Sequence, residues 1–272
     1  MSTHEPPSGH TEDSHPKDSH PEDSAIEGSH PQADHDGAAR LWDDMYRSRP
    51  RVWSGRPNPQ LVAEAAGLTP GTALDLGCGE GADALWLAER GWTVTAVDIS
   101  AVALERAAGH AAESEAGHRV TWLQRDLETW QPDTTFDLVS AQFLHSTEMP
   151  WQRSHRTAAD AVRPGGTLLV VGHHPDGMPP WSSHSQSTPS DAGHSQAGHS
   201  HSSGAPDHSA GHSGTARYFT AEQLVDELGI TLPEWSVEVV ESREREATGP
   251  DGQVAILADA VVRAVRLGSP GS

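Results

Sequence analysis

A glycine-rich run is the part of this sequence whose residue types and spacing are best suited to chemistry. The run from Ala73 to Gly81 reads ALDLGCGEG, and Gly77, Gly79 and Gly81 stand at alternate positions. Glycines there let the backbone turn tightly and let a ligand approach the main chain, beside the free N–H groups of a following helix. Asp98 ends the next apolar segment, where a carboxylate can accept hydrogen bonds from both hydroxyls of a ribose. The run therefore predicts a site for a ribose-containing ligand.

Two classes of ligand fit this run. Gly77, Gly79 and Ala82 satisfy the permissive dinucleotide pattern G-x-G-x-x-G/A, so a nicotinamide-dependent oxidoreductase is one alternative. Asp75 argues against it, because a carboxylate just before the loop is unfavourable beside a pyrophosphate. A sulfonium donor with an α-amino group carries no phosphate and is stabilised by a nearby carboxylate. The spacing therefore favours S-adenosylmethionine.

Alternating strands and helices must position this run. An apolar strand at 72–76 leads into the glycines, and a helix at 82–90 follows them. This alternation continues along the chain and predicts an α/β fold with a doubly wound, mostly parallel sheet that has helices on both faces. The last two strands leave no room for a helix between them, so we expect a C-terminal antiparallel pair. Further strands are expected at 93–98, 120–123, 136–141, 167–172, 235–240 and 256–265, and further helices at 100–112, 155–162 and 220–229.

Four motifs, taken in order and spacing, resemble the class I S-adenosylmethionine-dependent methyltransferase family of the small-molecule type. They are DLGCGEG at 75–81, VDIS at 97–100, RDL at 125–127 and RPGG at 163–166. The preceding segment, LWDDMY at 41–46 and VWSGRPN at 52–58, is similar to that of tellurite-resistance and thiopurine-methyltransferase-like enzymes. The resemblance implies a Rossmann-like fold and methyl transfer from S-adenosylmethionine to a small-molecule acceptor.

The resemblance also implies roles for residues around the donor. Asp98 would hold the ribose diol, Asp126 would accept from the adenine amino group, and Gln142 would face the methionyl end. Ile99 and Leu127 would pack beside adenine, with plain core packing as the alternative interpretation. The expected cofactor-binding residues are Asp75, Gly77, Gly79, Gly81, Asp98, Ile99, Asp126, Leu127, Gln142 and Trp53.

Methyl transfer needs a base only when the acceptor must lose a proton. His145 is the first candidate, because it follows the fourth expected strand at the edge where open α/β sheets bind ligands. A histidine that caps local backbone is the alternative interpretation. His173, at the end of the fifth expected strand, is the second candidate catalytic residue. Trp53 and its aromatic neighbours could fold over the donor, where a ring near the sulfonium contributes about 0.5–2 kcal/mol.

Composition separates two low-complexity stretches from the patterned sequence. Residues 1–39 hold nine acidic residues against one basic residue, Lys17, and are rich in His, Pro and Ser. Such a tail lacks the apolar surface that offsets ordering entropy, so we expect it to be disordered. Residues 40–272 are expected to form the methyltransferase domain, with a His/Ser/Gly-rich insert at about 175–216.

The histidine tracts offer another function. Imidazole-rich loops can chelate divalent metals weakly, so a metal-binding protein is the second alternative. The competing interpretation is a solvated insertion that merely tolerates histidine, and we assign no metal site from the sequence. The candidate chelating residues of the second tract are His184, His194, His199, His201, His208 and His212.

The formal net charge of −21 and the lack of a basic cluster argue against a nucleic-acid partner, which needs cationic residues to neutralise phosphates. No apolar run approaches membrane-spanning length, so no membrane association is expected. The single cysteine, Cys78, fits a reducing compartment, and we expect a cytoplasmic protein. A chain of 272 residues suits one core, as a monomer or homodimer.

Overall fold

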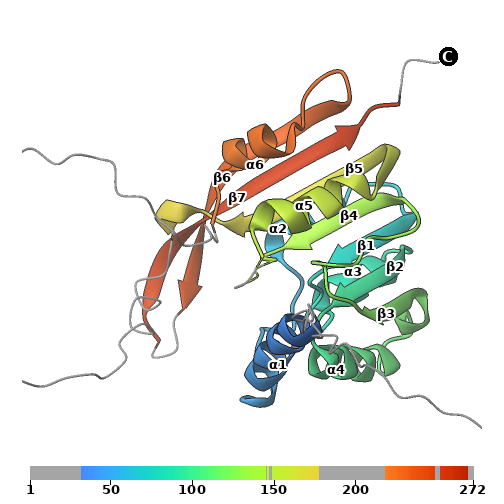
Figure 1. The fold of residues 1–272 in the computed structure, drawn as a ribbon, viewed down its shortest axis with the longest axis vertical. Helices are drawn as coiled ribbons and strands as arrows, with labels where there is room; N and C mark the ends of the chain where they lie inside the picture. The colour runs from blue at the N-terminus through green and yellow to red at the C-terminus, as the bar shows by residue number, and fades with distance from the viewer. Residues whose placement is uncertain (1–31, 145, 147–148, 178–217, 249–251, 269–272) are drawn as a thin grey trace, which may run out of the picture.

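The computed structural model describes residues 32–144, 146, 149–177, 218–248 and 252–268. One sheet contains β1 (Thr72–Leu76), β2 (Thr93–Asp98), β3 (Val120–Gln124), β4 (Phe136–Gln142), β5 (Val162–His173), β6 (Trp235–Thr248) and β7 (Val254–Arg266). Their order across the sheet is β3-β2-β1-β4-β5-β7-β6 (Figure 1). Strands β1 to β5 run parallel, whereas β7 is antiparallel to β5 and β6. The predicted doubly wound sheet with a terminal antiparallel pair is confirmed.

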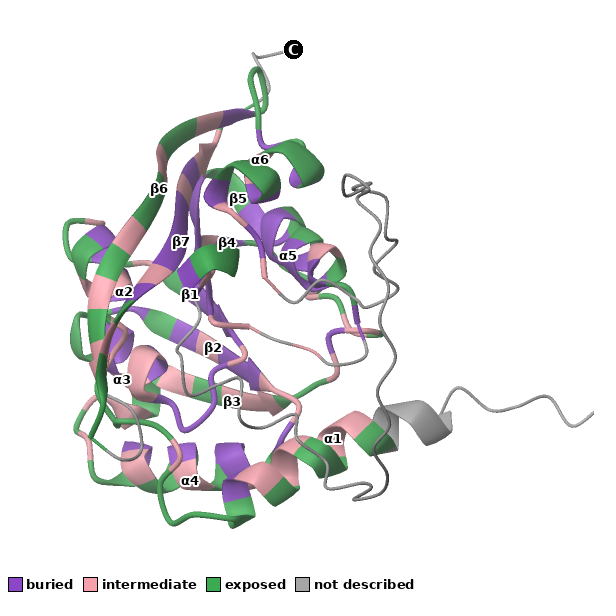
Figure 2. Cartoon of the chain, turned by 90° about the vertical axis from the view of Figure 1, so that its left-hand side faces the viewer, coloured by how far each residue is buried: buried purple, intermediate pink, exposed green. Residues whose placement is uncertain are grey.

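Two apolar layers enclose this sheet. Val139 and Leu168 belong to the layer under α5 (Trp151–Asp160) and α6 (Ala221–Leu228). Leu138 and Leu169 belong to the opposite layer, under α2 (Pro59–Ala65) and α3 (Ala82–Glu89). Successive strand residues point to opposite faces, so a strand covered on both sides must be apolar throughout. Figure 2 shows this burial on the central strands and greater exposure on the edge strands β3 and β6.

The chain reverses its direction across the sheet between β1 and β4. From β1 it proceeds outward to β2 and β3, and it then returns to place β4 on the other side of β1. Open α/β sheets bind ligands at this kind of switch point, outside the carboxyl ends of the strands. The glycine run follows β1 and therefore lies at that edge. Beside it, α1 (Gln32–Arg47) packs against α4 (Ala101–Ala112) (Figure 2).

Two helices begin at the capping residues that the sequence predicts. Ser100 accepts a hydrogen bond from the N–H of Ala103, which caps α4. Thr220 and Gln223 form the reciprocal capping box at the start of α6. Gly229 ends that helix with a φ of 65°, a conformation that glycine adopts at little cost.

Strand β5 begins earlier than the sequence indicates. Helix α5 ends at Asp160, and β5 starts at Val162, whereas the sequence placed a helix to 162 and a strand from 167. The pairing with β4 jumps from Phe136↔Val162 to Leu138↔Thr167, so the RPGG segment forms an irregular insertion within the strand. Gly165, with a φ of 81°, allows this bulge.

The C-terminal hairpin is also longer than expected. Strands β6 and β7 have 14 and 13 residues. The expected strand at 235–240 is too short because charged residues at 241–246, in the outer half of β6, hide the strand pattern. Pairing between β5 and β7 stops at His173↔Asp259, whereas β6 and β7 stay paired as far as Thr248↔Val254. The outer part of the hairpin therefore extends beyond the rest of the sheet (Figure 1).

The ends of the expected domain fall near the limits of the described residues. Helix α1 starts at Gln32, before the expected boundary at residue 40, and the expected disordered tail before it lies outside the described residues. Short 3₁₀ turns occupy Gly117–Arg119 and Pro175–Gly177, and the rest of the expected insert, as far as 216, is not described. Within the described segments, none of the helices combines the length and apolarity needed to cross a bilayer.

Candidate functional site

The glycine turn has the backbone that its sequence predicts. Gly77, Gly79 and Gly81 have φ values of 72°, 52° and 84°, in the left-handed region where other residues are strained. A Cβ on Gly79 would lie 2.9 Å from Tyr46 Oη, and one on Gly77 would lie 2.7 Å from Leu144 Cδ1. Conformation and close approach therefore both require glycine, and the turn leads directly into the N-terminus of α3.

Asp98 holds this turn from the end of β2. Its Oδ2 accepts from the N–H of Gly79 at 2.9 Å, and its Oδ1 accepts from the N–H of Ser100 at 2.9 Å. Burial raises the pKa of Asp98, and the hydrogen bonds from Ser100 and Gly79 oppose that rise. A carboxylate offers about four acceptor positions, so two hydrogen bonds leave capacity for hydroxyls of a ligand.

Three carboxylates gather around the loop. Asp75 is 1% exposed, and its Oδ2 has no hydrogen-bond partner among the described residues. Burial raises the pKa of Asp75 well above its ordinary value, and the charges of Asp83 and Asp98 raise it further. Burial also raises the pKa of Asp83 to about 6, against a hydrogen bond from the N–H of Asn58. The loop therefore favours a cationic ligand, because a positive charge would relieve both burial and mutual repulsion.

The orphaned Asp75 oxygen and the glycine cradle test which ligand fits. The donor S-adenosylmethionine carries a sulfonium and an α-ammonium, and the buried carboxylates around the loop would stabilise both. A pyrophosphate would add negative charge beside Asp75, so the dinucleotide alternative fits poorly. The residues present therefore fit the sulfonium donor.

Asn58 and Gln142 join the loop to the end of β4. Asn58 Nδ2 donates to Gln142 Oε1 at 2.9 Å, and Gln142 Nε2 donates to Ser140 Oγ at 3.0 Å. The backbone N–H of Asn58 donates to Asp83 Oδ1 at 2.6 Å, while the Asn58 side chain caps α2. Asn58 and Asp83 were missed by the sequence analysis, although Asn before Pro59 is a common helix start.

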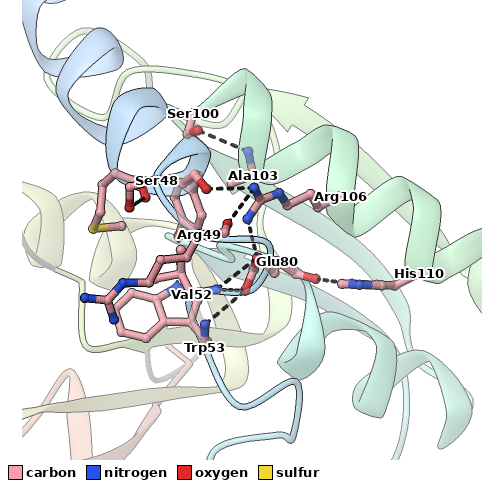
Figure 3. Close-up of polar contacts among 11 residues, drawn as sticks. Ser48, Arg49, Val52, Trp53, Glu80, Ser100, Ala103, Arg106 and His110 are labelled. Atoms are coloured by element: carbon pink, nitrogen blue, oxygen red, sulfur yellow. Dashed lines mark hydrogen bonds and ion pairs between the residues drawn. The ribbon is translucent and has the colours of Figure 1, made fainter. Parts of the chain in front are cut away.

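Glu80 and Arg106 fasten the segment before α2 over the glycine loop (Figure 3). Glu80 is 5% exposed and accepts from the backbone N–H groups of Val52 and Trp53. Arg106 Nη1 donates to Glu80 Oε1 at 2.9 Å, and its Nη2 donates to the carbonyl of Tyr46 at 2.7 Å. Burial opposes ionisation of Glu80, but these hydrogen bonds lower its pKa. We call Glu80 and Arg106 the latch, which the sequence analysis did not identify.

Two aromatic side chains, Tyr46 and Trp53, lie close to the glycine loop. Trp53 Nε1 donates to Tyr46 Oη at 3.0 Å, and both atoms lie close to the position of a Cβ on Gly79. Burial raises the pKa of the Tyr46 hydroxyl, and the charge of Asp98 adds to this rise. Trp53 remains 52% exposed, so much of its ring surface is available to a ligand or to solvent.

The residues expected at the adenine end follow β2 and β3 at the same edge. Ile99 and Asp126 are half-buried, and Asp126 Oδ1 accepts from the N–H of Glu128 at 2.8 Å. Leu127 is buried in the main apolar cluster, which agrees with its alternative interpretation as core packing. Contact of these residues with adenine stays a prediction.

The two candidate bases have different outcomes. His145 lies outside the described residues. His173 ends β5, with its ring centroid 4.5 Å from that of Phe143 and its Nδ1 3.8 Å from Asp259 Oδ1. Within the described segments, no group of three or more His, Cys, Asp or Glu residues is arranged to hold a metal ion. The candidate chelating residues His184, His194, His199, His201, His208 and His212 all lie outside those segments.

Comparisons with known proteins agree with this geometry. Residues 73–166 match the family model described as a methyltransferase domain. Thiocyanate methyltransferase 1 of Brassica oleracea is 29% identical over 148 residues, which are 52% of this chain and 66% of that protein. This chain spans about half to two thirds of the length of the curated relatives that it matches.

Solved structures share the fold over most of the described chain. A structure from work on the conversion of a disulfide bond into a thioacetal group during echinomycin biosynthesis is 25% identical, with a TM-score of 0.59. It covers 85% of this chain and 93% of its own. TehB from Haemophilus influenzae is 16% identical, with a TM-score of 0.54, and covers 83% of this chain and 66% of its own. All four sequence motifs lie within the matched residues, on the expected doubly wound, mostly parallel sheet. The part of this chain that carries the glycine run, residues 73–166, belongs to the methyltransferase-domain family.

Proposed function

We propose that this chain transfers a methyl group from S-adenosylmethionine to a small-molecule acceptor. The observation that carries the proposal is the buried Oδ2 of Asp75, which has no hydrogen-bond partner among the described residues and lies in a cluster with Asp83 and Asp98. A cation is the ligand that such a cluster of carboxylates stabilises most. When bound, the sulfonium donor supplies an electrophilic methyl carbon.

The residues of the chain align and shield this donor. Asp98 would accept from the ribose hydroxyls, and Asp75 would face the positive end of the donor. Tyr46 and Trp53 would cover the loop and exclude water, which strengthens the electrostatic interactions inside. The proposed donor-binding residues are Asp75, Gly77, Gly79, Gly81, Asp98, Ile99, Asp126, Leu127, Gln142 and Trp53.

The nature of the acceptor follows from two kinds of support. The relative from Brassica oleracea is named for thiocyanate, a small anion. The net charge of −21 disfavours a nucleic-acid acceptor, whose phosphates need cationic residues. We therefore propose a small molecule, with His145 and His173 as the candidate bases when the acceptor carries a proton.

The remaining expectations concern the setting of the enzyme. A single buried cysteine, Cys78, suits a reducing compartment, so the cytoplasm is the proposed location. A monomer or homodimer is the proposed assembly. Metal binding by the histidine tracts is a separate proposal that does not enter the methyl-transfer reaction.

Calorimetry with three ligands tests the proposal. S-adenosylmethionine and its product S-adenosylhomocysteine should bind at one site, and NAD should not. Transfer of a labelled methyl group to a panel of small thiols, phenols, amines and inorganic anions should then identify the acceptor class. Binding of NAD without binding of either sulfur compound would refute the proposal.

A further inference from the structure

A second polar cluster lies at the same edge of the sheet, on the far side of β4 from the glycine loop. His173 of β5 and Asp259 of β7 are directly paired across the antiparallel ladder. Asp259 is 0% exposed, and its Oδ2 accepts from Arg245 Nε at 2.7 Å. Its Oδ1 accepts no hydrogen bond from the described residues and faces His173 Nδ1 at 3.8 Å. The buried carboxylate thus joins one guanidinium and one imidazole.

The fold alone does not require this carboxylate. Asp259 is followed by the fully buried run Ala260, Val261 and Val262, which packs in the core. A buried charge is costly unless it is paired, and an apolar residue at this position would continue the core. The Asp259 carboxylate is therefore explained better by its interactions with Arg245 and His173 than by core packing.

Phe143 connects this cluster to the donor loop. Its ring lies against His173, and the guanidinium of Arg245 lies 5.5 Å from its centroid. The backbone of Phe143 has a φ of 52°, which is strained for a residue other than glycine. The next residue, Leu144, packs directly on Gly77. His173 is thus separated from the donor loop by the two side chains at the end of β4.

We infer that His173 is the catalytic base for a protic acceptor, and that Asp259 is its positioning residue, oriented by Arg245. This inference rests on the proposed methyl transfer. A base whose other ring nitrogen faces a buried carboxylate is held in one tautomer and one orientation. Separations between such groups are often long before substrate binds. The acceptor class is a neutral molecule with an O–H or S–H group.

The step conserves atoms and charge. A lone pair on the acceptor oxygen or sulfur forms the new bond to the methyl carbon. The carbon–sulfur bond of the donor breaks, and its electron pair stays on sulfur, which becomes a neutral thioether. The acceptor's proton passes to Nε2 of His173, so the positive charge of the donor ends on the imidazole. Asp259 lies on the Nδ1 side of the ring, where it stabilises that charge.

Acceptors with and without a proton provide the test. In His173→Asn, kcat for phenol and for an alkanethiol should fall by about 10²-fold or more, the usual contribution of a general base. Methylation of iodide and thiocyanate, which have no proton to lose, should be unchanged. The loss should also shrink from phenol to the more acidic 4-nitrophenol. His174→Asn, at the adjacent position, is the matched control and should retain both activities.

A readout without turnover tests the positioning role. Histidine ¹⁵N spectra of the full chain, assigned by the signal lost in His173→Asn, should show a neutral ring protonated on Nδ1. Asp259→Asn should redistribute the proton between the ring nitrogens. Because Asp259 is buried and this variant could misfold, Arg245→Gln offers a second route. It should lower kcat for phenol, and Arg245→Lys should restore part of the loss.

Each result decides the inference. Equal loss for protic and protonless acceptors would give His173 a structural role and overturn it, as would an unchanged rate with phenol. Methylation of thiocyanate by the wild type without methylation of any protic acceptor would also overturn it. Absence of S-adenosylmethionine binding in calorimetry would instead refute the proposed function, and the inference with it.

Discussion

Around the glycine loop, single side chains place negative charge where a positive ligand must be. Asp75, Asp83 and Asp98 all have raised pKa values, and burial is the largest cause in each case. Carboxyl groups with strongly shifted pKa values cluster at functional sites, where a bound ligand can supply the opposite charge. At the scale of single residues, the defining feature of the site is this cluster of buried carboxyl groups, which a cationic ligand would stabilise.

Removal of the Asp98 carboxylate tests its role in donor binding. We expect Asp98→Ala to weaken S-adenosylmethionine binding by about 1–3 kcal/mol, the range for lost hydrogen bonds to a charged group. This loss includes the effect of losing the hydrogen bond from the N–H of Gly79 to Asp98, which holds the glycine turn in place. Calorimetry measures it, and Glu89→Gln on the exposed end of α3 is the control. An affinity equal to that of the wild type would contradict the assignment.

The raised pKa of Asp83, about 6 against an ordinary 3.8, predicts two opposite pH dependences. A carboxyl with a higher pKa in the folded chain binds more protons when folded, so its contribution to stability increases as pH falls through about 6 toward 4. Relative to Asp83→Asn, which does not titrate, the wild-type free energy of unfolding should therefore rise across this window. Urea denaturation of both proteins measures the difference.

Affinity for the donor should change in the other direction. The ionised carboxylates attract the cation, so binding of S-adenosylmethionine should weaken as pH falls through about 6. In the stability measurement, burial lowers the pKa of His155 to about 4, so its contribution to the free energy of unfolding falls as pH falls. This contribution is present in both the wild type and Asp83→Asn, so the comparison cancels it. A wild type and variant with parallel pH profiles would show that Asp83 has an ordinary pKa.

Among the elements, the latch determines how the N-terminal segment meets the loop. Arg106 on α4 joins Glu80 in the loop to the carbonyl of Tyr46 at the end of α1. We expect Arg106→Ala to cost about 1–3 kcal/mol of stability, because the buried Glu80 loses its cation. Hydrogen exchange at residues 46–53 should become faster, and donor affinity should fall.

An exposed ion pair on α1 provides the control for the latch. Arg47 pairs with Asp43 and Asp44 at the surface, where such pairs contribute about 0–1 kcal/mol. Arg47→Ala should leave both donor affinity and exchange at 46–53 close to wild-type values. If the two variants behave alike, the latch does not hold the segment over the loop.

Local patterns account for the elements that the sequence predicts correctly. The glycine turn, the Ser100 cap and the Thr220 capping box depend on residues a few positions apart, so their signals are visible in the chain itself. Asn58 and Arg106 were missed because their partners are distant in sequence. The outer half of β6 was missed because its residues are charged, and two strands that pair with each other beyond the core need no apolar face.

At the scale of the whole molecule, an ionic network ties the C-terminal hairpin to the donor site. Glu64 at the end of α2 accepts from Arg243 of β6 at 2.6 Å and from Arg263 of β7 at 2.9 Å. Asn58 caps helix α2 and forms hydrogen bonds with Asp83 and Gln142. The hairpin therefore supports the helix beside the loop, although β4 and β5 separate the hairpin from β1 in the sheet.

Breaking this ionic network should lower donor affinity, although Glu64 is not one of the proposed donor-binding residues. Glu64→Ala removes the buried carboxylate that two guanidinium groups share, leaving Glu241 to Arg243 and Glu238 to Arg263. We expect a loss of about 1.5–3 kcal/mol in the free energy of unfolding. Helix α2 is then held to β6 and β7 by fewer polar contacts, the hydrogen bonds from Arg243 to Gln60 and from Arg263 to the Glu64 carbonyl. Donor affinity should therefore also fall, measured by calorimetry on protein shown to be folded. Glu246→Gln, exposed in the outer hairpin, is the control. A destabilised Glu64→Ala with wild-type affinity would show that the hairpin stabilises the sheet alone and leaves the geometry of Asn58 unchanged.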